Sequence, residues 1–243
     1  MNLNELADEL LADKHVDDDE VQGIIHQDIL IRYNSINVIV GKRGSGKTYF
    51  IARELIKLSY APGNRYSQVY YITDKEQDQT FDFAKNCVNP NVEITTVKTK
   101  DAMKVIKALS LAKARLNDDD NDMYRKALNA DNLNFTPHTL IIFDDCIGLF
   151  KHDSSLSKKL FENRQPHITY VLILQDIGLA TSIKCNLDMM VLFGGFSRQK
   201  FAVLTYQLPP IDGFDFEMYS TLGKNDYVAI DYNDDSVIVK YRE

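Results

Sequence analysis

Eight residues near the start of the chain have the types and spacing of a phosphate-binding loop. Gly41, four further residues, Gly46, Lys47 and Thr48 fit the pattern G-x-x-x-x-G-K-[ST]. In this pattern backbone N–H groups surround the phosphates, the lysine reaches the outer phosphates and the hydroxyl binds magnesium. Glycine lets the backbone come that close. We therefore predict that the following residues bind a nucleotide: Gly41, Lys42, Arg43, Gly44, Ser45, Gly46, Lys47, Thr48 and Tyr49.

The segments on both sides of this loop have the patterns that such a loop requires. Residues 36–40 are apolar and mostly β-branched, which is typical of a short buried strand. After the loop, Phe50, Ile51, Leu55 and Leu58 recur at helical spacing. The N-terminus of that helix would also favour anionic phosphate. Strand, loop and helix therefore follow one another in the expected order.

Two carboxylates follow a second apolar run, at Asp144 and Asp145 after residues 139–143. Parallel-sheet folds bind ligands at the carboxyl ends of their strands, and successive side chains of a strand face opposite ways. The first acid can hold magnesium together with Thr48, and the second can orient or deprotonate an attacking water. The alternative is that these acids are turn residues.

Gln175 ends the next apolar run, residues 168–175. An amide both donates and accepts hydrogen bonds, so it suits contact with the γ-phosphate or the attacking water. ATPases with an additional strand carry a polar sensor at this place, whereas an ordinary strand-end glutamine would only cap a turn. We predict the sensor role.

The elements that must position these side chains suggest an α/β fold. Apolar runs predict buried strands over 67–73, 92–97, 139–143, 168–175 and 188–195, and residues 101–116 are predicted to be helical. We expect a RecA-like P-loop fold with a largely parallel sheet covered by helices on both faces. A C-terminal β-hairpin is predicted at about 226–241, and an exposed loop at 117–122.

The predicted domain organisation is an N-terminal acidic amphipathic segment with a linker, residues 1–33, and a P-loop domain over 34–243. The chain has a net charge of -7, but residues 1–20 hold eight acids against Lys14, so the remainder is formally neutral. Charge therefore neither indicates nor excludes a nucleic-acid partner. The three cysteines lie far apart, and neither an export signal nor a membrane-spanning run is recognisable.

Three segments taken in order resemble a known family. The sequences "GKRGSGKT", "TLIIFDD" and "NRQPHITYVLILQD" are similar to those of the DNA-packaging ATPases of poxviruses and other large double-stranded DNA viruses, in the FtsK/HerA superfamily. The likeness runs from about residue 36 to 195. It implies a motor, driven by ATP and Mg²⁺, that packages double-stranded viral DNA into a preformed capsid.

The resemblance also implies roles for single residues. Lys47 and the loop would bind ATP, Asp144 would bind magnesium, Asp145 would activate water and Gln175 would be the sensor. Such motors complete each site with an arginine from a neighbouring subunit. Arg164 matches the family's arginine, although the histidine that commonly follows it directly is displaced here to position 167, and Arg198 is the rival.

The same resemblance implies partners and a location. We expect a homo-oligomeric ring, a pentamer or a hexamer, that contacts viral capsid or vertex proteins. The protein would act in the host cytoplasm, in the viral factory, or with the virion. Open alternatives are a cellular or plasmid DNA-pumping ATPase of the same superfamily, a P-loop small-molecule kinase, a GTPase switch, and an assembly protein that binds ATP without hydrolysing it.

Overall fold

The structure is a computed structural model that describes residues 30–61, 64, 66–116, 138–150, 168–175, 181–184, 186–206, 208, 211–234 and 236–240. Three predicted features lie outside these residues: the segment 1–29, the loop 117–122 and Arg164. Leu30 and Ile31, at the end of the predicted linker, are buried against the body of the domain. Among the described residues, no helix has the length and apolar character needed to cross a membrane.

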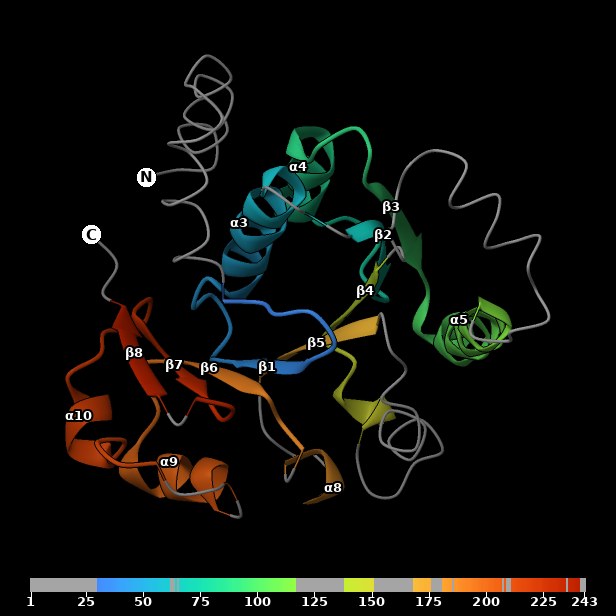
Figure 1. Cartoon of the computed structure of the whole chain (residues 1–243). Coiled ribbons are helices and arrows are strands. Elements are labelled where there is room, and N and C mark those ends of the chain that lie inside the picture. The colour runs from blue at the N-terminus through green and yellow to red at the C-terminus, as the bar shows by residue number, and fades with distance from the viewer. Residues whose placement is uncertain are drawn as a thin grey trace, which may run out of the picture.

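One eight-stranded sheet runs through the molecule in the order β3-β2-β4-β5-β1-β6-β7-β8 (Figure 1). The first six strands in this order are mutually parallel, and β7 and β8 are antiparallel additions at one edge. The strands are β1 Ile36–Val40, β2 Tyr66–Ile72, β3 Glu93–Val97, β4 His138–Asp144, β5 Ile168–Leu174, β6 Met189–Phe193, β7 Tyr227–Asp231 and β8 Ser236–Lys240. This confirms the predicted α/β fold with its largely parallel sheet and C-terminal hairpin.

Helices cover both faces of the sheet (Figure 1). Helices α3 and α4 lie on one face, and α5, α8 and α9 lie on the other, with α10 beside α9. The helices are α3 Lys47–Tyr60, α4 Gln79–Cys87, α5 Ala102–Leu116, α8 Thr181–Lys184, α9 Arg198–Thr205 and α10 Phe216–Ser220, with 3₁₀ turns η2 Thr99–Asp101 and η3 Ile147–Leu149.

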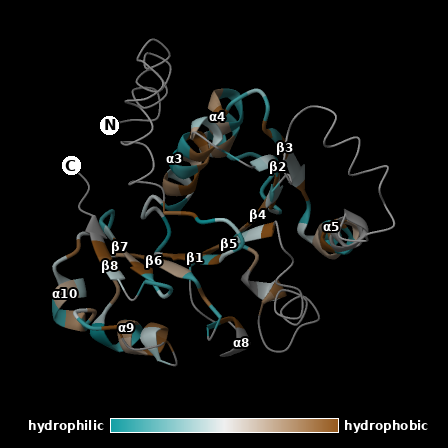
Figure 2. Ribbon diagram, viewed as in Figure 1, coloured by the Kyte–Doolittle hydropathy of each residue, from teal (hydrophilic) through white to brown (hydrophobic). Residues whose placement is uncertain are grey.

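Two hydrophobic cores result, one on each face. On β4, Leu140 and Ile142 belong to the core on the face of α3 and α4, whereas Ile141 and Phe143 belong to the core on the face of α5, α8 and α9. Every residue of β4 and β5 is buried, which explains why these strands are continuous apolar runs instead of alternating ones. Figure 2 shows the corresponding pattern, with hydrophobic residues along the central strands and mixed colours on the helices.

The order of the central strands decides which loops meet. Strand β5 lies between β1 and β4, so the strand that ends near Gln175 separates the strand before the phosphate loop from the strand before Asp144. This is the additional-strand arrangement that the sequence predicted. Helix α4 was not predicted, although Asp78 caps its N-terminus and its buried face, Phe81 and Ala84, has helical spacing.

Candidate nucleotide-binding site

The phosphate loop connects the buried strand β1 to helix α3. Gly41 donates its N–H to the Leu174 carbonyl at 3.2 Å, which ties the start of the loop to the neighbouring strand β5. Gly44 and Gly46 have φ angles of 72° and 97°, in the left-handed region that favours glycine. A side chain at Gly41 would have its Cβ 2.4 Å from Ser45 Oγ. The loop geometry therefore requires these glycines.

Lys47 begins α3 and lies across its own loop. Its ammonium donates to the carbonyls of Gly41 at 2.7 Å and Lys42 at 3.0 Å. Burial lowers the pKa of Lys47, while the negative charges of Asp144 and Asp145 partly oppose this effect. The lysine is thus placed between the loop and the two strand-end acids, where a phosphate chain would need a positive charge.

The other predicted loop residues surround this lysine. Ser45 is buried, and Thr48 and Tyr49 are half-buried in the first turn of α3. Lys42 and Arg43 are exposed at the tip of the loop, and the Lys42 ammonium lies 5.8 Å from the centre of the Phe196 ring. The sequence motif therefore forms one continuous loop and helix start.

Asp144 and Asp145 face in different directions, as expected, although Asp145 lies just beyond the last residue of β4. Asp144 is buried with 3% of its surface exposed, and Asp145 is exposed. Asp145 has a φ of 59°, which is uncommon for a residue other than glycine, although aspartate tolerates it better than most. Unusual backbone angles of this kind are concentrated at functional sites.

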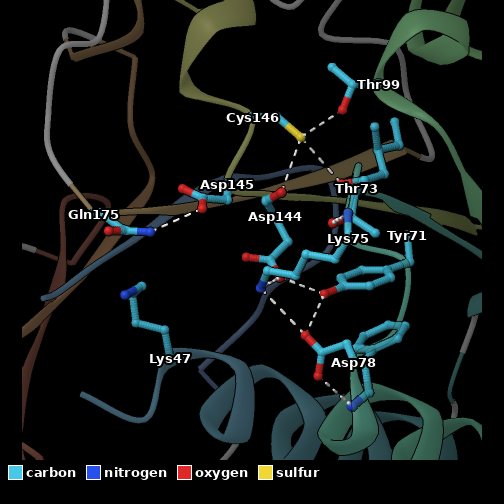
Figure 3. A network of polar contacts seen from close by, with 12 residues as sticks. Lys47, Tyr71, Thr73, Lys75, Asp78, Thr99, Asp144, Asp145, Cys146 and Gln175 are labelled. Carbon is cyan, nitrogen blue, oxygen red and sulfur yellow. Dashed lines mark hydrogen bonds and ion pairs between the residues drawn. The ribbon is translucent and has the colours of Figure 1, made fainter. Parts of the chain in front are cut away.

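Gln175 and Asp145 contact one another. Gln175 donates its Nε2 hydrogen to Asp145 Oδ2 at 3.0 Å. In Figure 3 the Lys47 side chain points toward this pair, from the opposite side of the same space. The structure therefore brings together four of the predicted side chains at the carboxyl edge of the sheet: Lys47, Asp144, Asp145 and Gln175.

Of the two arginine candidates, Arg198 is among the residues that the structure describes. Arg164 lies outside the described residues. Arg198 is the first residue of α9, and its guanidinium lies 5.6 Å from the centre of the Phe216 ring, a cation–π distance. Within one chain, therefore, Arg198 packs on α10, shortly after the chain leaves β6.

Three residues that sequence analysis did not select surround Asp144. The hydroxyl of Tyr71 and the ammonium of Lys75 each lie 2.5 Å from Asp144 Oδ2. Asp78 Oδ2 lies 3.2 Å from the Tyr71 hydroxyl and 3.4 Å from the Lys75 ammonium. The Tyr71 ring stacks on Phe81 of α4 at 3.6 Å between ring centroids. Figure 3 shows this cluster on the β2 side of Asp144.

The charges in this cluster stabilise one another. Burial lowers the pKa of Lys75, but its hydrogen bonds and ion pairs with Asp144 and Asp78 outweigh this effect and raise the pKa overall. Burial, together with the charge of Asp144, raises the pKa of Tyr71, so its hydroxyl stays protonated and remains a donor. Asp144 is therefore a buried carboxylate whose Oδ2 has two close donors.

Comparisons with known proteins identify the fold. No model of a known family matches the sequence, and no curated protein matches it. Among solved structures, the DNA-packaging ATPase B204 from Sulfolobus Turreted Icosahedral Virus is similar, with a TM-score of 0.58 and 17% identity over 86% of this chain and 98% of that one. B204 from Sulfolobus turreted icosahedral virus 2, in complex with ATP-gammaS, has a TM-score of 0.60 at 17% identity over the same shares.

A third similar structure comes from a larger protein. ATPases 2 and 3 of EssC from Geobacillus thermodenitrificans match with a TM-score of 0.59 and 12% identity, over 86% of this chain and 39% of that one. At these identities the likeness concerns the fold. The chain therefore has the P-loop ATPase fold that the B204 packaging ATPase also has, with its own phosphate loop and strand-end acids at the carboxyl edge of the sheet.

Proposed function

We propose that the protein is an ATPase that moves double-stranded DNA and packages a viral genome into a preformed capsid. The observation that carries the ATPase part is the meeting of the phosphate loop with Asp144, Asp145 and Gln175 at one edge of the sheet. The DNA part rests on the resemblance of the three sequence segments and on the shared fold with the B204 packaging ATPase.

The residues divide the chemistry between them. The loop N–H groups and Lys47 bind the phosphates of ATP, and Gln175 contacts the γ-phosphate or the water. The hydroxyl of Thr48 and the carboxylate of Asp144 are hard oxygen donors of the kind that Mg²⁺ takes, together with phosphate oxygens. When bound, Mg²⁺ neutralises the charge that develops on the phosphates. Asp145 orients and deprotonates the attacking water.

The same proposal includes assembly. A ring of five or six copies would place an arginine, Arg164 or Arg198, in the site of the neighbouring copy, where its charge stabilises the transferring phosphoryl group. The ring would contact capsid or vertex proteins, in the host cytoplasm or at the virion. The division into an N-terminal segment, 1–33, and a P-loop domain, 34–243, belongs to the same proposal.

The test is the rate of ATP hydrolysis over a range of protein concentrations, with and without long duplex DNA. A Lys47→Ala variant serves as the blank because it lacks the ammonium that reaches the phosphates. Stimulation by DNA that rises cooperatively with protein concentration supports an assembled DNA motor. Hydrolysis that is indifferent to DNA and concentration contradicts it, and phosphate transfer to a small acceptor favours the kinase alternative.

A further inference from the structure

Lys75 reaches Asp144 because of how the strands pair. β2 and β4 are neighbouring parallel strands, with Ile72 paired to Phe143, so their carboxyl ends lie side by side. Lys75 lies three residues beyond β2, and Asp144 is the last residue of β4. The ion pair therefore joins two loops at the same edge of the sheet that carries the phosphate loop.

The backbone around Lys75 is fixed by several hydrogen bonds. Thr73 donates its N–H to the Val97 carbonyl at 3.0 Å, and Lys75 donates its own N–H to Thr73 Oγ1 at 3.2 Å. Thr99 donates its N–H to Asp74 Oδ1 at 3.0 Å. The backbone at residues 73 to 75 is therefore held by the fold, which places Lys75 within reach of Asp144.

The Lys75 ammonium has a second carboxylate within reach. Asp78 Oδ2 lies 3.4 Å from it, and Asp78 Oδ1 accepts the Phe81 N–H at 3.2 Å as the N-cap of α4. The cap fixes the position of Asp78. A small rotation of the Lys75 side chain can therefore release Asp144 while the ammonium stays paired with Asp78.

Asp144 cannot keep this arrangement unchanged if it becomes a ligand of Mg²⁺. Its Oδ2 already has Tyr71 and Lys75 at 2.5 Å, in a side chain that is almost fully buried. A Mg²⁺ ion held by this carboxylate, directly or through a bound water, would lie close to the Lys75 ammonium on the same group, and the two positive charges would repel each other.

We propose that Lys75 is an exchangeable counterion of Asp144: it pairs with both Asp144 and Asp78 before ATP and Mg²⁺ bind, and with Asp78 alone afterwards. This inference rests on the proposed ATPase function. It makes Lys75 a positioning residue that keeps the Asp144 carboxylate charged and oriented until Mg²⁺ binds.

The experiment measures the affinity of Mg²⁺ for the full-length protein saturated with ATPγS, by calorimetric titration, in wild type and Lys75→Met. Methionine has a similar length and no charge. Because the competitor for Asp144 is lost, Mg²⁺ should bind about two- to fivefold more tightly, as expected when a partly exposed ion pair is removed. Weaker Mg²⁺ binding in Lys75→Met would overturn the proposal, because it would mean that Lys75 assists the metal complex.

Two further variants separate this competition from a general charge effect. Lys104→Met removes an exposed lysine from α5 and should leave the Mg²⁺ affinity unchanged. Lys75→Arg keeps the charge and can bind Asp144 through two hydrogen bonds, so its Mg²⁺ affinity should equal or fall below that of wild type. Equal Mg²⁺ affinity in wild type, Lys75→Met and Lys104→Met would contradict the proposal.

A second readout is the melting temperature, measured first without and then with nucleotide. In EDTA, without nucleotide, Lys75→Met should melt about 1–4 °C below wild type, because Asp144 loses a charged partner. Addition of Mg²⁺ and ATPγS should then raise its melting temperature by more than it raises that of wild type. If wild type does not bind ATPγS, the proposed function itself fails and this inference fails with it. If wild type binds but the rise in melting temperature is the same in both proteins, only the role of Lys75 fails.

Discussion

Replacing Asp145 by asparagine should remove most ATP hydrolysis while leaving the fold and ATP binding in place. Asparagine has the same shape, and its amide oxygen can still accept the hydrogen bond that Gln175 donates at 3.0 Å. It lacks the negative charge needed to take a proton from the attacking water. The substitution thus tests the chemistry of one carboxylate with little change in structure.

The expected magnitudes follow from where Asp145 lies. The side chain is exposed and makes one hydrogen bond to Gln175, so the free energy of unfolding should fall by no more than about 1 kcal/mol. For a domain of this size, that corresponds to a melting temperature lowered by about 2–4 °C. Loss of a general base lowers kcat by about 10²- to 10⁴-fold, or about 2.7–5.4 kcal/mol of transition-state stabilisation.

The assay pairs phosphate release at saturating Mg²⁺–ATP with calorimetric binding of ATPγS. Asp144→Asn is the matched comparison, because it makes the same chemical change one residue earlier in a buried side chain with two close donors. Asp145→Asn should bind ATPγS within about threefold of wild type, whereas Asp144→Asn should lose Mg²⁺-dependent affinity. A folded Asp145→Asn protein with more than a tenth of the wild-type rate would refute the assignment.

Three further substitutions test the phosphate loop, the cluster around Asp144 and a buried acid in α3. Gly41→Ala should lower the free energy of unfolding by about 1–3 kcal/mol through overpacking against Ser45 Oγ, measured by urea denaturation; an unchanged urea midpoint would contradict the tight loop geometry. Tyr71→Phe should lower the free energy of unfolding by about 1.5–3 kcal/mol, again measured by urea denaturation, because Asp144 loses a hydroxyl donor. A decrease below about 0.5 kcal/mol would mean that Lys75 alone satisfies the carboxylate. Burial raises the pKa of the fully buried Glu54 above the 4.5 of an ordinary glutamate, although the Leu30 N–H lowers it in part. The folded chain then binds this proton more tightly than the unfolded chain, so stability from this group is greatest below pH 4.5 and falls as the pH rises. Glu54→Gln should therefore gain stability relative to wild type as the pH rises above 4.5, measured by urea denaturation at several pH values, and a difference that is the same below and above pH 4.5 would refute the sign.

The parts of the site that sequence could predict are those coded by neighbouring residues. The phosphate loop is a spacing within eight residues, and the strand-end acids follow directly from one apolar run. Strand boundaries were accurate to one or two residues because buried parallel strands are continuous apolar segments: the run 168–175 corresponds to β5, Ile168–Leu174.

The cluster around Asp144 could not be predicted because it depends on strand order. Lys75 and Asp144 are separated by 69 residues, and only the pairing of β2 with β4 brings them together. In the sequence, Lys75 is one charged residue in a polar stretch after a strand. A rule that polar residues after every strand of a parallel sheet share one edge would have selected Lys75, but it would not have given its partner.

The position of β1 in the sheet also governs when the site can form during synthesis. Its two partners are β5 and β6, and Ile36 pairs with Tyr170. At about 5–20 residues per second, a ribosome needs on the order of ten seconds to add the intervening chain. Throughout that interval, the strand that carries the phosphate loop has been made but its partners in the sheet have not. The complete site, with β1 between its two partners, therefore cannot form until both β5 and β6 have been made.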